Sequence, residues 1–417
     1  MENAGCSERH VLLKGLIVLL VLGAFILTGP VGIGHAAKEI KVGIDTGLTG
    51  GASPWGKRAW NSFQLIFDEV NAQGGIKSMG GAKIKYVVMD HQSKPDIAGS
   101  NAEKLIRDGC SVIFGANFSD AAMVATQVCQ RAKVPFISTN DGDPMITDRG
   151  FDYVFRTNPT FIQLGEGALA FTQGLEKKSG TPIKKVGILI AQSAGGKSLL
   201  EIYERTIPKV YNVVFKETYP VSQQDFTGIV SKMKRLGVEY VFQMALPADA
   251  ILVTRAYKEQ DYNPAGFLGA IAGHQVMDYI DALGKDADYT FCISWYSADL
   301  KVPKIQEFIT KYKNRFGIEP TADDAVVANG VSVLVDALER AGTDNPAKLR
   351  DALKATNLNV GQYWYLIPDG CKFDEKGQNI KQKVVTFQIR GGKWKSVYPE
   401  GFAAIEPVFP IPPWNRR

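Results

Sequence analysis

The sequence is poor in the residues from which metal sites and catalytic centres are commonly built. It has four histidines and five cysteines among 417 residues, with no C-x-x-C and no H-E-x-x-H pattern. A zinc site therefore lacks a ligand set, and we expect no bound metal and no cofactor. The G-x-S-x-G pattern of a nucleophilic serine is also missing, so the motifs do not indicate an enzyme.

Positive charge is not concentrated in any part of the chain. The net charge is +5, from 48 Lys and Arg against 43 Asp and Glu, which are interspersed. A nucleic-acid surface needs clustered positive charge, so we expect no nucleic-acid partner. The hydrophobic content of 45% is typical of a globular protein, and the length predicts two lobes rather than one core.

The N-terminal segment has the pattern of an export signal. Arg9 and Lys14 precede an uncharged run from Gly15 to Gly29, which is followed by Pro30 and small residues near Ala36. This order predicts a signal peptide over residues 1–36 and export from the cytoplasm. The alternative is an uncleaved membrane anchor, because the apolar run approaches spanning length.

The stretch "VGILIAQSAGGKSLL" at 186–200 has the order strand, small-residue loop and helix found in phosphate-binding loops. Ala191, however, occupies the position of the first glycine of that motif, where a β carbon obstructs the tight loop. We therefore interpret the stretch as an ordinary strand–turn–helix unit.

Strand and helix patterns alternate along the chain after the N-terminal segment. The first half predicts strands at 39–45, 83–90, 111–115 and 134–139 and helices at 62–76, 95–107 and 119–132. The pattern restarts near residue 160, with strands at 186–190, 212–219, 238–245, 266–270 and 289–296 and helices at 162–176, 197–207, 226–236 and 248–260. Helices at 304–316, 321–341 and 346–356 and a β-hairpin at 383–398 complete it. Such alternation predicts parallel sheets with helices on both faces.

Several separated motifs occur along the chain in the order "KVGIDTGLTGGASPWG", "NSFQLIFDEVNAQGGI", "GCSVIFGANFSDAAMVATQVCQRAKVPFIST" and "CKFDEKGQN". Together they resemble the motifs of the type I periplasmic solute-binding proteins of ABC importers, in particular the Leu/Ile/Val-binding family. With the predicted signal peptide, the resemblance implies a periplasmic location. The resemblance implies an α/β fold of two doubly wound, Rossmann-like lobes joined by a hinge. It also implies a clamp that closes on a small solute and docks on an inner-membrane permease without catalysis. We expect the protein to act as a monomer.

Within this resemblance, we assign residues 37–157 and 297–362 to the N-terminal lobe. Residues 158–296 and 363–417 form the C-terminal lobe.

Ser119 is the strongest candidate for a ligand contact. It stands at the predicted start of a helix after a strand, where its hydroxyl and the nearby N–H groups can bind an anion. A plain N-cap serine would occupy the same place. The resemblance favours binding, since this position matches the family's serine that takes the ligand carboxylate.

Other candidates follow from the same resemblance. Trp55, in the loop after the first strand, and Phe118 would line the cleft, with Trp295 as a further candidate for the apolar wall. Asn140, Asp141 and Gly142 follow the fourth strand, at positions whose counterparts touch the ligand carboxylate; a solvated turn is the alternative.

The sequence departs from the family where amino-acid-binding members hold the ligand ammonium. The acid expected just after the first hinge corresponds to Phe161, and the second corresponds to "AIAG" at 270–273. We therefore expect a receptor for a small carboxylate with an apolar or aromatic body. One alternative is a receptor for a branched-chain or other hydrophobic amino acid that uses acids elsewhere in the cleft. Another is a membrane-tethered sensor domain.

Four cysteines remain beyond the predicted signal peptide, at positions 110, 129, 292 and 371. Disulfides are allowed in an exported protein. Cys110 and Cys129 fall at one end of the same strand–helix unit, so we predict that they pair. Two buried free thiols are the alternative.

If the signal peptide is cleaved, the exported protein begins at Ala37 or Lys38. N-terminal sequencing of protein recovered from the periplasm checks this, because a signal peptidase cuts after small residues. An exported protein that retains Met1 would instead support the tethered sensor.

Overall fold

The computed structural model of the protein describes residues 39–221 and 223–417. The predicted signal peptide, residues 1–36, and the alternative membrane anchor lie outside these residues. No helix in the described part of the chain has both the length and the apolar character needed to cross a membrane.

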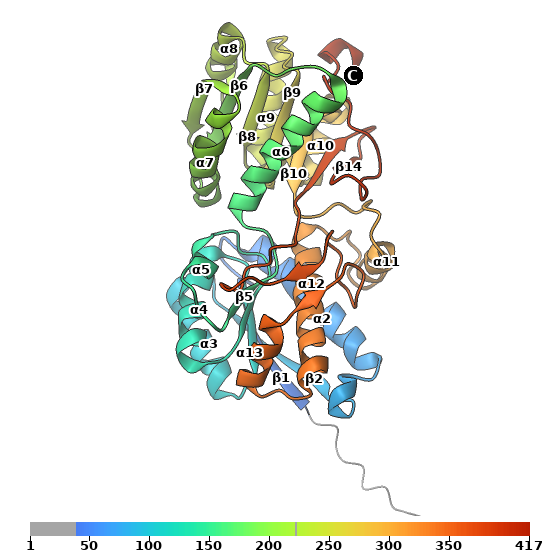
Figure 1. The fold of residues 1–417 in the computed structure, drawn as a ribbon. Helices are drawn as coiled ribbons and strands as arrows, with labels where there is room; N and C mark the ends of the chain where they lie inside the picture. The colour runs from blue at the N-terminus through green and yellow to red at the C-terminus, as the bar shows by residue number, and fades with distance from the viewer. Residues whose placement is uncertain (1–38, 222) are drawn as a thin grey trace, which may run out of the picture. The chain divides into compact units, whose positions relative to one another are not determined.

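The first sheet is parallel and has five strands in the order β2-β1-β3-β4-β5 (Figure 1). Its strands are β1 (Glu39–Thr46), β2 (Lys83–Asp90), β3 (Val112–Ala116), β4 (Phe136–Ser138) and β5 (Val154–Arg156). The helices between them are α2 (Ser53–Ala72), α3 (Pro95–Arg107), α4 (Ser119–Ala132) and α5 (Met145–Asp148). This order is that of a doubly wound sheet.

Both faces of this sheet are buried, as the alternation of side chains along β3 shows. Val112 and Phe114 belong to the apolar cluster that contains the buried residues of α2, whereas Ile113 belongs to the cluster that contains those of α3 and α4. Successive side chains of a strand point to opposite faces, so helices cover the sheet on both sides.

The second sheet has seven strands in the order β14-β13-β10-β9-β8-β6-β7. Its strands are β6 (Lys185–Ala191), β7 (Asn212–Tyr219), β8 (Tyr240–Met244), β9 (Gly266–Ala270), β10 (Phe291–Ser294), β13 (Val385–Ile389) and β14 (Trp394–Tyr398). Strands β6 to β10 are parallel, and β13 and β14 form an antiparallel hairpin that pairs with β10. The predicted α/β architecture and the C-terminal hairpin are confirmed.

Further helices accompany the second sheet and the segments that follow it. They are α6 (Phe161–Ser179), α7 (Ala194–Thr206), α8 (Thr227–Leu236), α9 (Pro247–Glu259), α10 (Met277–Leu283), α11 (Ile305–Phe316), α12 (Ala322–Ala341) and α13 (Pro346–Lys354). Ser193 is the N-cap of α7, and its Oγ accepts from the N–H of Gly196 at 3.0 Å. The turn of the phosphate-loop-like stretch is thus a helix cap.

The chain passes between the two sheets three times. It leaves the first sheet after β5 and enters the second through α6, and it returns after β10 to α11 and α12, which pack against α2. A small sheet of β11 (Asn357–Leu358) and β12 (Cys371–Lys372) precedes the last passage to β13. The lobe boundaries given above stay a prediction.

Arg156, the last residue of β5, holds the first and third passages together. Its Nε donates to Gln378 Oε1 at 2.6 Å, and its Nη2 donates to Thr147 Oγ1 at 2.9 Å. Its Nη1 donates to the backbone carbonyls of Asp141, at 3.3 Å, and Asp143. The side chain is fully buried, and this burial lowers the pKa of the guanidinium to about 10. The buried charge is tolerated here because each of the three guanidinium nitrogens donates a hydrogen bond to a protein group.

Arg156→Met is expected to lower the free energy of unfolding by about 3–5 kcal/mol, since it leaves buried carbonyl and amide groups without partners. Guanidinium chloride unfolding measures this. Arg107→Met is the matched control: Arg107 is 68% exposed and lies 3.8 Å from Glu103, so its loss costs less than about 1 kcal/mol. Equal losses in the two variants would contradict the role of Arg156. If the methionine variant does not fold, Arg156→Lys keeps the charge but replaces the three donor nitrogens with one ammonium, and it is expected to lower the free energy of unfolding more than Arg107→Met does.

Candidate functional site

The carboxyl ends of β1, β3 and β4 meet at one edge of the first sheet, where open α/β sheets bind ligands. Side chains from all three strand ends are joined there. The Asn117 side-chain amide donates to Thr46 Oγ1 at 3.3 Å, and Thr139 Oγ1 donates to Asn117 Oδ1 at 3.3 Å. The loops that carry the predicted ligand residues therefore form one connected group.

Ser119 is the first residue of α4, and the N-cap position belongs to Phe118, whose side chain cannot cap the helix. The plain N-cap role considered for Ser119 is thus not what the geometry provides. Within residues 39–221 and 223–417, the hydroxyl of this half-buried serine has no hydrogen-bond partner. The first helical bond runs from the N–H of Ala122 to the carbonyl of Phe118, which leaves the preceding N–H groups available. Such a group of donors can bind a carboxylate.

Two aromatic side chains lie near this helix start or the adjacent strand ends. The ring of Phe118 stacks on His91, with centroids 6.4 Å apart. Trp55 is 46% exposed and lies in the first turn of α2, not in a loop as predicted. The helix begins earlier than expected because Pro54 suits its first turn. Trp295 is buried, and its Nε1 has no partner in the described part of the chain.

Two side chains of the turn after β4, those of Asp141 and Asn140, bond to different parts of the protein. Asp141 is buried, and its Oδ2 accepts from Ser138 Oγ at 2.7 Å and from the N–H of Ala116 at 3.0 Å. Burial raises the pKa of Asp141. One oxygen of its carboxylate is therefore bonded to the protein itself, whereas Oδ1 is buried and has no partner among the described residues. Asn140 is half-buried, and its amide donates to Asp323 Oδ1 at 2.8 Å.

Phe161 begins α6 after a capping box formed by Thr160 and Gln163. A β carbon on Gly142 would lie 2.8 Å from the Phe161 ring, so the ring occupies the space of a side chain at that position. The same ring lies 3.4 Å from the β-carbon position of Gly195, at the start of α7. Phe161 thus contacts the turn after β4 of the first sheet and the first helix after β6 of the second.

Two acids at the start of α12 were not among the predicted site residues. The Asp324 carboxylate accepts hydrogen bonds from Tyr312, Thr321 and, at 3.4 Å, Arg58. Asp323 bonds to Asn140 and has a longer 3.5 Å contact with Thr321 Oγ1. Burial raises the pKa of both, that of Asp324 to about 6. The T-x-x-D spacing at 321–324 indicates a helix start but not the contact with Asn140, which is 183 residues away.

The turn after β9, "AIAG", contributes no acid. Ile271 has a φ of 41° and a ψ of −152°, a strained conformation for a β-branched residue. The following His274 is fully buried, and its Nε2 accepts from the Gln243 amide at 2.7 Å. Burial lowers the pKa of His274 to about 3, so this histidine is neutral.

The structure replaces the predicted disulfide with the alternative of two thiols. Cys110 and Cys129 are free and buried, and both belong to the apolar cluster between the first sheet and helices α3 and α4. Burial raises the pKa of the Cys110 thiol to about 11 and raises that of Cys129 as well. Both therefore serve as small apolar side chains.

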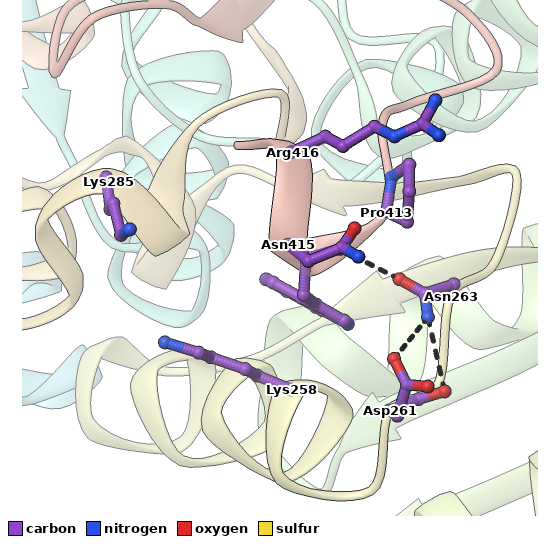
Figure 2. A pocket seen from close by; sticks show the side chains of 8 residues that line it. Lys258, Asp261, Asn263, Lys285, Pro413, Asn415 and Arg416 are labelled. Atoms are coloured by element: carbon purple, nitrogen blue, oxygen red, sulfur yellow. Dashed lines mark hydrogen bonds between the residues drawn. The ribbon is translucent and has the colours of Figure 1, made fainter.

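A surface hollow of about 620 Å³ lies beside the C-terminal residues of the chain (Figure 2). It is lined by Lys258, Asp261, Asn263, Lys285 and residues 413–416. Asn263 bonds to Asp261 and accepts from the N–H of Trp414, so the hollow is bounded by the docked C-terminus. None of the predicted ligand residues lines it.

The chain belongs to the periplasmic binding protein family: residues 39–393 match the family profile described as "Periplasmic binding protein". The proteins of this family are solute-binding proteins rather than enzymes. Those of ABC importers bind small molecules and interact with permeases, and the family implies a periplasmic or extracellular location.

Three relatives illustrate the likeness. Leu/Ile/Val-binding protein homolog 7 of Brucella suis biovar 1 is 26% identical over 408 residues, which cover 96% of this chain and 98% of the relative. The solved structure of the substrate binding protein LivJ from Streptococcus pneumoniae, in complex with isoleucine, is 22% identical, covers 87% of this chain and 100% of its own, and has a TM-score of 0.70. The solute binding protein from Rhodopseudomonas palustris BisB5, in complex with 3,4-dihydroxy benzoic acid, is 23% identical, covers 88% and 98%, and has a TM-score of 0.68. These structures confirm the type I binding fold.

Asp45, at the end of β1, is a buried acid close to this edge of the sheet. Its Oδ1 accepts from the Asn101 amide at 2.8 Å, and its Oδ2 has no partner among the described residues. Burial is the largest influence and raises the pKa of Asp45 to about 8. The folded protein therefore holds a proton that the unfolded chain releases at a much lower pH.

The free energy of unfolding of the wild type is expected to fall, relative to Asp45→Asn, as the pH rises from about 4 to about 8. In this window the folded state binds one more proton than the unfolded state, which gives a slope of at most about 1.4 kcal/mol per pH unit. Urea unfolding of both proteins across the window measures the difference. The difference isolates Asp45, because Asp141, Asp323 and Asp324 are present in both proteins. A difference that does not change with pH would contradict the buried, protonated Asp45.

Proposed function

We propose that this protein is the exported receptor of an ABC importer and that it captures a small carboxylate with an apolar or aromatic body between its two lobes. It delivers this solute to an inner-membrane permease. In this proposal the segment 1–36 directs export to the periplasm, and the protein acts as a monomer without a nucleic-acid partner.

The observation that carries the proposal is the donor group at the start of α4. The Ser119 hydroxyl and the first N–H groups of the helix have no partner among the described residues, and they lie at the ligand-binding edge of a doubly wound sheet. The positive end of the helix dipole adds to their affinity for an anion. A carboxylate is the small anion that this geometry suits.

The body of the ligand is inferred from the groups near these donors. Phe118 and the half-exposed Trp55 offer aromatic surface, and the Phe161 ring stands where amino-acid-binding relatives are expected to hold an ammonium. An ammonium placed against this ring would lose its water without gaining a charged partner. An apolar group placed there has no such hydration to lose.

The ligands of the two solved relatives agree with the part of this proposal that concerns the carboxylate. Isoleucine and 3,4-dihydroxy benzoic acid both carry a carboxyl group, whereas only isoleucine carries an ammonium. The shared carboxyl group supports a carboxylate-binding site in the proposed receptor, and the two ligands differ at the end of the molecule away from that group.

One observation favours the alternative of an amino-acid receptor. Asp323 lies beside Asn140 and, unlike Asp324, has a carboxylate with few partners. It is an acid from elsewhere in the first lobe that could pair with an ammonium. Under this alternative, Asp323→Asn weakens the binding of an amino acid but not that of its des-amino analogue.

Ser119→Ala is expected to weaken carboxylate binding by about 1.5–3 kcal/mol, that is, tenfold or more, because it removes a hydrogen bond to a charged group. Stability should change little, since Ser119 does not cap its helix. Calorimetry measures the affinity and thermal unfolding the stability. Ser100→Ala is the matched control, because this exposed serine bonds only to its own helix. Unchanged affinity in Ser119→Ala would place the carboxylate elsewhere.

The protein is expected to bind 4-methylpentanoate more tightly than leucine, and 3-phenylpropanoate more tightly than phenylalanine. Each amino acid must desolvate an ammonium against Phe161, and a penalty of about 1.4 kcal/mol is tenfold in affinity. Calorimetry on both pairs measures the preference. Phe161→Asp should shift the preference towards the amino acids, whereas Phe161→Leu, the apolar control, should not. Tighter binding of the amino acid in both pairs would favour the alternative receptor.

A further inference from the structure

The peptide of Ala116 is held from both sides. Its carbonyl oxygen lies 2.9 Å from His91 Nε2, and its N–H donates to Asp141 Oδ2 at 3.0 Å. His91 is 0% exposed and Asp141 is 1% exposed. Two residues further along the chain is Phe118, and Ser119 follows it. Side chains that follow β2 and β4 are therefore hydrogen-bonded to the segment that carries the proposed ligand donors.

The bonding of His91 defines which of its nitrogens carries the proton. Its Nδ1 accepts from the N–H of Ser93 at 3.1 Å, so Nε2 must hold the hydrogen and donate it to Ala116. Ser93 is itself fixed, because its Oγ donates to the carbonyl of Thr49 at 3.1 Å and accepts from the N–H of Ala52 at 2.8 Å. The orientation of the imidazole is thus set by the loops after β1 and β2.

His91 reaches the ligand segment by a second route. Its ring stacks on Phe118 at an interplanar angle of 25°. The imidazole therefore supports the aromatic residue before Ser119 as well as the peptide that precedes it. Neither contact involves the solute directly.

Asp141 connects the same peptide to the first passage between the sheets. Its carboxylate accepts from Ser138 Oγ as well as from Ala116, while its backbone carbonyl accepts from the side chains of Arg156 and Asn158. The position of the Ala116 peptide therefore depends on residues of the first passage between the sheets.

We propose that His91 and Asp141 are positioning residues that hold the Ala116 peptide so that Phe118 and Ser119 present a preformed carboxylate site. The proposal rests on the function proposed above, because it assigns these two side chains to the site at Ser119. A preformed site binds more tightly, because the loop is already ordered and its conformational entropy is not lost when the ligand binds. Neither side chain needs to touch the ligand.

Two substitutions of His91 separate its two hydrogen bonds. His91→Asn keeps an acceptor near the place of Nδ1, for Ser93, and loses the donor to Ala116. His91→Gln keeps a donor near the place of Nε2, for Ala116, and loses the acceptor for Ser93. Both variants lose one hydrogen bond and the stacked ring, so they are matched in what they remove from the fold. Asp141→Asn, which keeps an acceptor for Ala116, and Asp141→Leu, which does not, form the second pair.

The probe is 3-phenylpropanoate, measured by calorimetry, with thermal unfolding as the check on stability. His91→Asn is expected to bind about tenfold more weakly than His91→Gln, and Asp141→Leu about tenfold more weakly than Asp141→Asn. Hydrogen exchange of the unliganded protein, followed by mass spectrometry over residues 112–122, should be faster in the two variants that release Ala116 than in their partners. Equal affinity and equal exchange within each pair would overturn the proposal.

Failure of the proposed function has a different signature. If Ser119→Ala binds the probe as well as the wild type, or if the wild type does not bind it, the assignment of the site fails. The exchange measurement still reports whether His91 and Asp141 hold the segment. If Ser119→Ala weakens binding while the members of each pair agree, only the positioning role is wrong.

Discussion

The structure depends on the burial of one guanidinium at the point where the chain leaves its first sheet. Arg156 is fully buried, so its donors depend on the protein groups around it, and these groups must stay where they are. Those groups are the turn after β4, through two backbone carbonyls, and the returning segment at Gln378. The predicted ligand turn and two of the three passages between the sheets are therefore fixed by the same side chain.

The regular elements could be predicted from the sequence where local signals define them. Helices α3 and α4 and strands β2, β7 and β9 have the predicted bounds, because proline, capping positions and apolar runs mark their ends. The start of α2 was predicted nine residues late, and the short β5 was missed. Strands of three residues carry too little periodicity to stand out, and β5 is recognised only by its pairing with β4.

Only those parts of the site that a local sequence pattern marks could be predicted from the sequence. Ser119 at a helix start could be read directly, and the structure adds that it is not the cap. The contacts of His91 with Ala116 and of Asp323 with Asn140 join segments far apart in the chain, and no local pattern indicates them. The free thiols of Cys110 and Cys129 show the same limit, since proximity in a strand–helix unit does not determine whether two sulfurs meet.

The contact between Phe161 and Gly142 has a consequence for how such a receptor can diverge. A β carbon at 142 would lie 2.8 Å from the aromatic ring, so replacing the glycine requires the ring to move or to be lost. Removing the ring alone leaves a gap beside a bare backbone turn. The two positions are therefore coupled: the side chain that fits at one position depends on the side chain at the other. In an alignment of descendants they should vary together, even though 19 positions separate them in the sequence.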